Sequence, residues 1–424
     1  MKPKAAEPGA RRATARRRSL ANVGGEVEAA GAPGVASKLR TALAIDPDPE
    51  QGRAHVHGFH SYPARMHPTV ARRLVELFAP TRGVVLDPFC GSGTVLVEAR
   101  LAGREAIGVD LNPLAAALAT LKVSGMTRVQ AEAMVAAARQ IGLQGEQRRK
   151  ARAGAMRRYP EIDARQFEPH VLLELDSIRE GIARSRPGVA TEALWLVLSS
   201  ILTKVSRKRG DTGEVQEQPR RLASGFTLRL FFSKAEELAA QLAEFTKRLP
   251  RGALQARVIC GDARELPGIE PASVDVVISS PPYPGNYDYL AHHETRLRWL
   301  SMNPGALAAD EIGARRKLDR IGPRAARAAF GREMAAVLTA SGRSLRAGGT
   351  VLLVIADSVV AGQVLRADEL MVACARQAGL AWKATASQRR PHFHKGTAHA
   401  FDRDDRREHV IAFVKTGAPG LGPA

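Results

Sequence analysis

The chain has few cysteines and no long apolar run. Its cysteines, Cys90, Cys260 and Cys374, lie far apart, so neither a disulfide framework nor a cysteine pair with zinc spacing is present in the sequence. The longest apolar run, 350–361, is interrupted by Asp357 and is too short to span a bilayer. The basic N-terminus lacks the apolar core of a secretory signal. These absences favour a cytoplasmic protein with no membrane segment.

Acidic residues are scarce relative to basic ones. The chain holds 63 lysines and arginines against 43 aspartates and glutamates, which gives a formal net charge of +20. Such an excess indicates a polyanionic partner, most simply a nucleic acid. A basic tail explains only part of the charge, because residues 2–18 contain seven basic residues and the remaining excess is spread along the chain.

The hydrophobic pattern divides the chain into five parts. Residues 1–45 are rich in Ala, Arg, Gly and Pro without periodicity, so we expect a disordered basic arm there, and 417–424 form a short tail. Buried strands and helices alternate in 46–122 and again in 255–416, which predicts an α/β core in two parts. Between them, 123–254 has helical periodicity and is too long for a loop. We therefore expect a mainly helical insert that could serve as a target-recognition lobe.

A strand, a glycine turn, a helix and a second strand follow one another in the first part of the core. The strand 83–87 ends in Asp87, the segment PFCGSGT at 88–94 opens the helix, and the second strand ends in Asp110. Glycines in such a turn let a ligand approach the backbone at the helix N-terminus.

The same turn departs from the two commonest phosphate-binding patterns. A P-loop needs Gly-Lys-Ser/Thr, and the turn has no lysine; a dinucleotide site needs a third glycine where Leu96 stands. A nucleoside without phosphate remains, with Asp110 accepting hydrogen bonds from the ribose hydroxyls and Asp87 near a cationic group. S-adenosyl-methionine has these features.

A second motif follows the apolar run 274–278. Two consecutive prolines in Ser279-Ser280-Pro281-Pro282-Tyr283 have no N–H to donate, so the strand must end there. The Ser280 hydroxyl and the Pro281 carbonyl can accept the two hydrogens of a flat NH₂ group, and Tyr283 can lie on its face. Pro-Pro alone would favour a plain turn that ends a strand; the functional interpretation depends on the upstream glycine turn, which fits the same chemistry.

Together, DPFCGSGT at 87–94 and SSPPY at 279–283 resemble the amino-methyltransferases of nucleic-acid bases, most closely the DNA adenine-N6 and cytosine-N4 group. The resemblance implies a Rossmann-like class I methyltransferase fold, with a seven-stranded, mainly parallel sheet and helices on both faces. It also implies S-adenosyl-methionine as the cofactor. FHSYPAR at 59–65 resembles the family's cofactor-packing motif. VICGDAR at 258–264 resembles the motif whose acidic residue contacts the adenine of the cofactor.

The resemblance assigns two sets of site residues. The residues implied in cofactor binding are Phe59, Tyr62, Asp87, Pro88, Phe89, Gly91, Gly93, Thr94, Asp110 and Asp262. The residues implied in catalysis are Ser280, Pro281, Pro282 and Tyr283.

The target base and the nucleic acid stay open. Serine rather than aspartate before Pro-Pro favours cytosine N4 over adenine N6, although the usual cytosine signature is Thr-Ser-Pro-Pro. RNA guanine-N2 methyltransferases share a similar glycine loop and Pro-Pro-Tyr but usually carry Asp, which favours DNA. A non-catalytic nucleic-acid-binding protein on the same fold is a further alternative. A restriction endonuclease is a candidate partner, and the sequence does not predict the oligomeric state.

Basic clusters in and after the insert are candidate nucleic-acid contacts. The predicted nucleic-acid contacts are Arg207, Lys208, Arg209, Tyr287 and Arg296. Any single basic cluster is equally a solvated helix face. Three nearby histidines, His55, His57 and His60, suggest a metal site. No partner cysteine or acid has zinc-site spacing, so we expect no metal.

Overall fold

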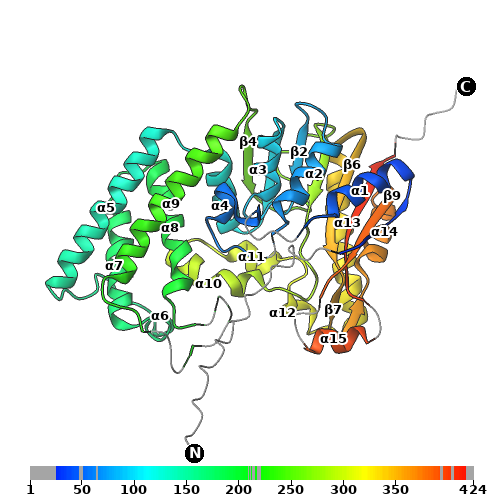
Figure 1. Ribbon diagram of the computed structural model, residues 1–424. Helices are drawn as coiled ribbons and strands as arrows, with labels where there is room; N and C mark the ends of the chain where they lie inside the picture. Colours follow the sequence, from blue (N-terminus) through cyan, green and yellow to red (C-terminus); the bar gives the residue numbers. More distant parts are fainter. Residues whose placement is uncertain are drawn as a thin grey trace, which may run out of the picture.

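The computed structural model describes residues 25–46, 51–63, 65–208, 210, 212, 215–216, 221–391, 395–402 and 405–416. Its centre is an eight-stranded sheet (Figure 1) with the strand order β1-β9-β10-β6-β5-β2-β3-β4. The strands are β1 (Val27–Gly31), β2 (Val84–Asp87), β3 (Glu105–Asp110), β4 (Ala256–Cys260), β5 (Val274–Ser279), β6 (Leu345–Ala356), β9 (Leu380–Arg389) and β10 (Arg407–Lys415).

The direction of the strands identifies the fold. Strands β4, β3, β2, β5 and β6 pair in parallel, whereas β10 is antiparallel to both β6 and β9. This arrangement is the Rossmann-like class I methyltransferase fold, as predicted. The sheet has one strand more than the predicted seven, because β1 adds to the edge of β9.

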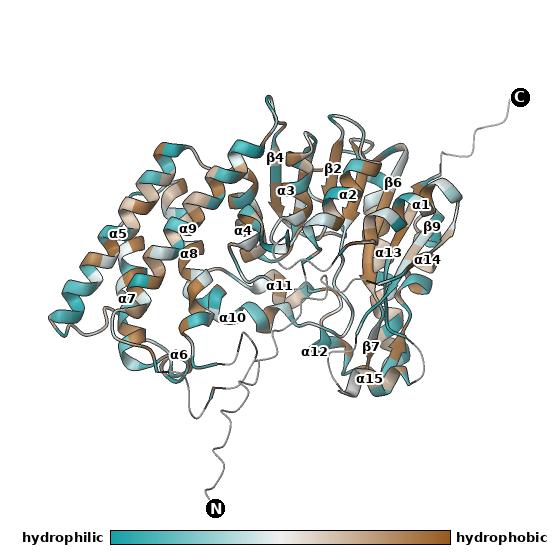
Figure 2. Ribbon diagram, in the orientation of Figure 1, coloured by the Kyte–Doolittle hydropathy of each residue, from teal (hydrophilic) through white to brown (hydrophobic). Residues whose placement is uncertain are grey.

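Helices cover both faces of the sheet because the central strands are apolar on both sides. One face packs against α1 (Pro33–Leu43), α2 (Pro68–Phe78), α3 (Thr94–Leu101) and α4 (Pro113–Ser124). The other packs against α13 (Pro323–Ser344) and α14 (Ala367–Gln377). Neighbouring residues of β2 face opposite cores, since Val85 belongs to the first and Leu86 to the second. The central strands are accordingly largely brown in Figure 2.

The prediction of a disordered arm over 1–45 is wrong for its last part. Val27–Gly31 pairs antiparallel with β9, and α1 buries Leu39 and Leu43 completely. The open edge of β9 supplies hydrogen-bond partners to a strand whose own sequence is only weakly apolar, which periodicity alone does not reveal. Residues 1–24 and the tail 417–424 lie outside the described residues.

The insert forms a helical lobe beside the strand β4 (Figure 1). Its helices are α5 (Arg128–Lys150), α6 (Glu161–Gln166), α7 (Pro169–Ala183), α8 (Val189–Val205) and α9 (Phe226–Arg248). Buried residues such as Leu175, Val197 and Phe231 belong to the same hydrophobic core as one face of the sheet. The lobe therefore packs onto the sheet domain through a continuous core.

The remaining elements are short. They are the 3-10 helices η2 (Gln51–Arg53) and η3 (His55–Gly58), the helices α10 (Tyr289–Trp299), α11 (Gly305–Asp310), α12 (Arg315–Leu318) and α15 (Lys395–Phe401), and the hairpin β7 (Ser358–Val360) with β8 (Gln363–Leu365). Within the described ranges, no helix combines the length and the apolar character needed to cross a membrane.

Candidate active site

The two sequence motifs lie side by side at the carboxyl ends of β2 and β5. These strands are parallel neighbours, with Leu86 opposite Val277. The chain leaves β2 towards β3 on one side and later returns to β5 on the other, so the strand order reverses here. Open α/β sheets bind their ligands at such a reversal.

A direct hydrogen bond joins the two motifs. The Ser279 hydroxyl donates to Asp87 Oδ1 over 2.6 Å, and both side chains are buried. Asp87 ends the strand before the glycine turn, and Ser279 precedes Ser280 of the second motif. Whatever binds at the glycine turn is therefore close to the Ser-Pro-Pro-Tyr turn.

The glycine turn depends on residues without a side chain. Gly91 has φ +50° and Gly93 has φ +86°, values in the left-handed region that favours glycine. A Cβ on Gly93 would lie 3.0 Å from Ala119 Cα, so α3 and α4 could not keep their spacing. Thr94, the first residue of α3, is buried directly after this turn. Glycine at these positions therefore lets the turn keep its backbone and lets α3 pack against α4.

Asp110, the last residue of β3, fixes the glycine turn. Its two carboxylate oxygens accept hydrogen bonds from the backbone N–H groups of Gly91 and Asn112, both over 2.8 Å. Burial raises the pKa of Asp110 to about 6, while these two hydrogen bonds oppose the rise. Each oxygen keeps a further lone pair, with which it can accept from a ligand hydroxyl.

Asp87 is a second buried carboxyl group beneath the turn. Burial raises its pKa to about 7, against the hydrogen bonds that it accepts from Ser279 and from the Phe89 N–H, the latter over 3.1 Å. The charge of Asp110 raises this pKa further. A cationic ligand would favour the ionised forms of both groups.

Tyr62 packs over the glycine turn. A Cβ on Gly91 would lie 3.4 Å from Tyr62 Cε1. The Tyr62 ring is nearly parallel to the rings of His293 and Tyr289, with centroids 4.9 and 6.5 Å away. Phe59 belongs to the hydrophobic core, where its ring centroid is 6.1 Å from that of His60. The segment around Tyr62 thus packs against the glycine turn, and its role in cofactor packing stays a prediction.

The other residues of the first motif surround the same turn. Pro88 is buried and Phe89 is half-buried in the loop that connects β2 to the glycines. Cys90 is buried, and its backbone N–H donates to the Val109 carbonyl over 3.0 Å. These contacts hold the loop against the end of β3.

In the second motif, Tyr283 is held by a residue of the last strand, β10. Pro281 is buried, Ser280 and Pro282 are half-buried, and the Tyr283 hydroxyl donates to Glu408 Oε1 over 3.0 Å. Arg390 Nε donates to the other oxygen of Glu408 over 3.0 Å. The sequence reasoning missed Glu408 and Arg390, because they come from the far end of the chain and no motif marks them.

Asp262 has a partner of its own. It follows β4, the neighbour of β3, and so lies at the same edge of the sheet. Arg264 Nε donates to both carboxylate oxygens of Asp262 over 3.0 Å. A role in adenine binding therefore requires Asp262 to share its oxygens with Arg264.

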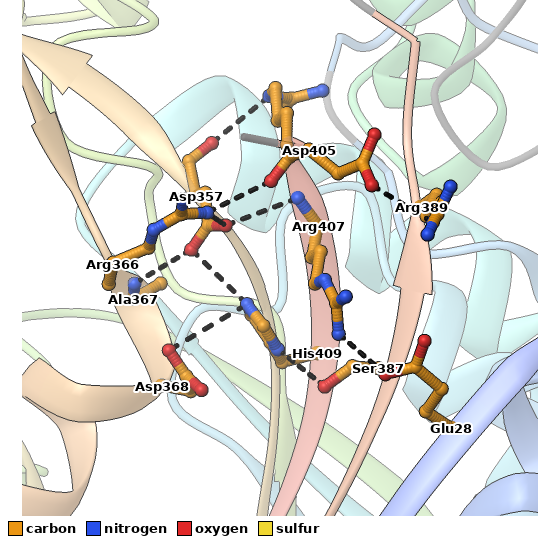
Figure 3. A network of polar contacts seen from close by, with 11 residues as sticks. Glu28, Asp357, Arg366, Ala367, Asp368, Ser387, Arg389, Asp405, Arg407 and His409 are labelled. Carbon is orange, nitrogen blue, oxygen red and sulfur yellow. Dashed lines mark hydrogen bonds and ion pairs between the residues drawn. The ribbon is translucent and has the colours of Figure 1, made fainter. Parts of the chain in front are cut away.

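A further carboxylate at this edge, Asp357 after β6, is fully engaged by the chain itself (Figure 3). It accepts hydrogen bonds from the backbone N–H groups of Ala367 (3.0 Å) and Arg407 (3.1 Å) and from Arg366 Nη1 (2.9 Å), and it lies 3.2 Å from His409 Nε2. Burial alone would raise the pKa of Asp357, but these hydrogen bonds and charges hold it below its usual value. We assign Asp357 a structural role.

The prediction that Arg296 contacts nucleic acid is wrong. Its side chain is completely buried, and it donates hydrogen bonds to Ser61 Oγ (3.2 Å), Thr203 Oγ1 (3.3 Å) and the Ser199 carbonyl (3.4 Å). Arg296 therefore ties α10 to α8 of the lobe. Sequence spacing could not tell a basic helix face that contacts DNA from one that packs inside the protein.

The other predicted contacts remain predictions. Arg207 and Lys208 are half-buried after α8, and the Arg207 N–H donates to the Gln166 carbonyl over 2.8 Å. Arg209 lies outside the described residues. Tyr287 is half-buried, with its ring centroid 5.7 Å from that of Tyr289.

Parts of the chain are similar to known methyltransferases. Residues 44–120 match the N6/N4 methyltransferase family model, described as DNA methylase. Over 87 residues the chain is 34% identical to the type II methyltransferase M.MjaII of Methanocaldococcus jannaschii, covering 20% of this chain and 16% of that protein. Over 63 residues it is 43% identical to the tRNA (guanine(10)-N2)-dimethyltransferase of Methanothermobacter thermautotrophicus, covering 15% and 18%. The matched part is thus a small share of each relative's length.

A solved structure aligns over more of the chain, but loosely. It is a SAM-dependent methyltransferase from Methanosarcina mazei, at 9% identity and a TM-score of 0.32, covering 81% of this chain and 98% of that one.

Proposed function

We propose that this chain transfers a methyl group from S-adenosyl-methionine to an exocyclic base amine in DNA; the match of residues 44–120 to the N6/N4 family model of DNA methylases supports this proposal. The observation that carries the proposal is the 2.6 Å hydrogen bond between Ser279 and Asp87. It brings the glycine turn, which suits the cofactor, next to the turn that suits an amine. Neither turn alone would support a transfer reaction.

The residues around the glycine turn fit S-adenosyl-methionine. Gly91 and Gly93 give the turn its left-handed backbone, and the Asp110 carboxylate can accept from ribose hydroxyls while it holds the Gly91 N–H. Asp87 is buried and would become ionised next to a cationic ligand. When bound, this cofactor supplies a methyl group already activated on a positively charged sulfur. The protein then has mainly to position the two reactants.

Ser280 and Pro281 would orient the amine. The lone pair of an aromatic amine is delocalised into the ring, which makes the nitrogen a poor nucleophile. Hydrogen bonds from its two hydrogens to the Ser280 hydroxyl and the Pro281 carbonyl favour a pyramidal nitrogen whose lone pair faces the methyl group. Glu408 holds the Tyr283 hydroxyl, so the ring keeps one orientation from which it can stack on the base.

The charge of the chain fits a duplex substrate. A base inside a duplex must leave the stack to reach this turn, which costs a few kcal/mol that contacts to the backbone have to offset. A net charge of +20 favours attraction to the phosphates. We assign phosphate contact and target reading to the helical lobe 123–254, which includes Arg207 and Lys208.

Cytosine N4 is the favoured target, because Ser280 stands where adenine enzymes usually carry aspartate. The second candidate is guanine N2 in RNA, favoured by the 63-residue match to a tRNA (guanine(10)-N2)-dimethyltransferase. The serine before Pro-Pro argues for DNA.

One experiment separates these candidates. The protein is incubated with S-adenosyl-methionine labelled in its methyl group and with duplex DNA, RNA or neither, and the products are digested to nucleosides. We expect labelled N4-methylcytosine from DNA; N6-methyladenine would correct the base, and N2-methylguanosine from RNA would support the second candidate. No transfer to any substrate would contradict the proposal. The same assay is run on Ser280→Ala, which should transfer less methyl group than wild type. Ser37→Ala, a substitution at an exposed serine of α1, is its matched control.

A further inference from the structure

Three polar side chains with no part in the proposed reaction meet between η3 and α3. His55 and His57 belong to η3, and Glu98 belongs to α3, which follows the glycine turn. All three are buried, with 7%, 0% and 5% of their surface exposed. Each offers one ligand atom, and these three atoms lie within 4.8 Å of one another. The neighbouring histidines were visible in the sequence, but Glu98 was not linked to them because it is far from them along the chain.

We propose that His55, His57 and Glu98 bind a divalent transition-metal ion of the Zn²⁺ type. Two imidazoles and one carboxylate, completed by a water molecule, form a donor set that zinc uses in proteins. Zinc lies about 2.0–2.2 Å from such ligand atoms, so two ligands of one ion are at most about 4.3 Å apart. Side-chain rotations that move the ligand atoms by less than about 1 Å would bring the observed cluster into that range. The proposal is independent of the methyl-transfer reaction.

Buried imidazole nitrogens without a hydrogen-bond partner support a bound ion at this position. His57 Nε2 lies 2.7 Å from Glu98 Oε1, but in the described part of the chain the Nδ1 atoms of His55 and His57 are buried with no hydrogen-bond partner. A buried polar atom left unsatisfied costs about 1–3 kcal/mol. An ion with its bound water supplies partners that the described chain does not.

The charges around the cluster predict which ions bind. Arg65 and Lys122 act on the His57 ring electrostatically, and Arg248 acts on both His55 and Glu98. These positive charges oppose any cation, so affinity has to come from direct bonds to imidazole nitrogen. Mg²⁺ and Ca²⁺ prefer oxygen ligands, whereas Zn²⁺ and Co²⁺ bind imidazole well. We therefore expect the site to take transition ions and to reject Mg²⁺ and Ca²⁺.

The position of the cluster indicates a structural role. η3 leads into the segment that carries Tyr62 over the glycine turn. The His55 ring stacks on Phe245 of α9, with centroids 6.2 Å apart. A bound ion would thus hold η3 to α3 where the sheet domain meets the helical lobe.

The test uses the full chain, stripped of metal with a chelator and then titrated with Zn²⁺. We expect one Zn²⁺ per chain by elemental analysis, a rise in the melting temperature, and visible absorption bands of a four- or five-coordinate site with Co²⁺. Mg²⁺ and Ca²⁺ should change nothing. If the wild-type chain takes up no Zn²⁺ or Co²⁺, the proposal is wrong. This measurement needs only the wild-type protein.

Substitutions locate the ion. His57→Ala and Glu98→Gln should each weaken Zn²⁺ binding by more than ~100-fold, since even partners behind the ligands are worth 10- to 100-fold. Glu98→Gln keeps an acceptor for His57, so it should stay folded if His57→Ala does not. The control is His409→Asn in the other candidate cluster, Asp357, Asp368 and His409, where Asp357 is already engaged (Figure 3). Loss of binding in His409→Asn but not in Glu98→Gln would overturn the assignment.

Discussion

Replacing Asp87 by asparagine should flatten the dependence of stability on pH. Burial raises the pKa of Asp87 from 3.8 to about 7 in the folded protein. Its protonated form therefore stabilises the fold fully below pH 3.8, and this stability is lost as the pH rises through 7. The shift of about three pH units corresponds to at most ~4 kcal/mol, of which ~2 kcal/mol falls between pH 5 and 7.

Urea denaturation of wild type and Asp87→Asn at pH 5, 6, 7 and 8 measures this effect. The difference between the two free energies of unfolding should change by ~2 kcal/mol from pH 5 to 7 in favour of the variant. The buried Asp110 is present in both proteins, so its own titration largely cancels. Asp319→Asn, at an exposed position, controls for loss of one carboxylate. Parallel curves for wild type and Asp87→Asn would refute the buried, raised-pKa carboxyl group.

Four further substitutions test the site and the fold. Ser280→Ala should reduce labelled methyl transfer while calorimetry shows unchanged cofactor affinity; an equal loss of both would remove the role assigned to Ser280. Asp110→Ala should weaken S-adenosyl-methionine binding in calorimetry, and unchanged affinity would show that Asp110 is misassigned. Gly93→Ala should lower the free energy of unfolding by about 1–2 kcal/mol, because φ is +86° and the new Cβ meets Ala119; a thermal melt equal to wild type would contradict this. Arg296→Met should destabilise by ~2 kcal/mol in urea without changing the DNA affinity of the folded protein, whereas a loss of affinity alone would restore Arg296 as a DNA contact.

The part of the fold that local pattern controls was predictable. Buried strands with glycine and proline turns after them fix where β2 and β5 end, and the motifs there carry enough residue identity to indicate their chemistry. The same reasoning missed β1, because a weakly apolar strand pairs at the sheet edge through its backbone rather than through a side-chain pattern.

Contacts between distant segments were not predictable. Arg296 reads as a surface cation in sequence, yet it is buried against Ser61 and Thr203. Glu408 reaches Tyr283 from the last strand, and Glu98 reaches His57 from another helix. Each of these depends on tertiary packing, about which a single sequence without homologues gives no local signal.

The central claim is that the glycine turn and the Ser280–Tyr283 turn serve one reaction site, and a crystal structure with S-adenosyl-homocysteine tests it most directly. We expect the ribose to contact Asp110, the adenosyl group to lie along the Gly91 turn, and the sulfur to face Ser280 and the Pro281 carbonyl. A ligand bound away from Asp110, or one whose sulfur is separated from Pro281 by protein, would contradict the account.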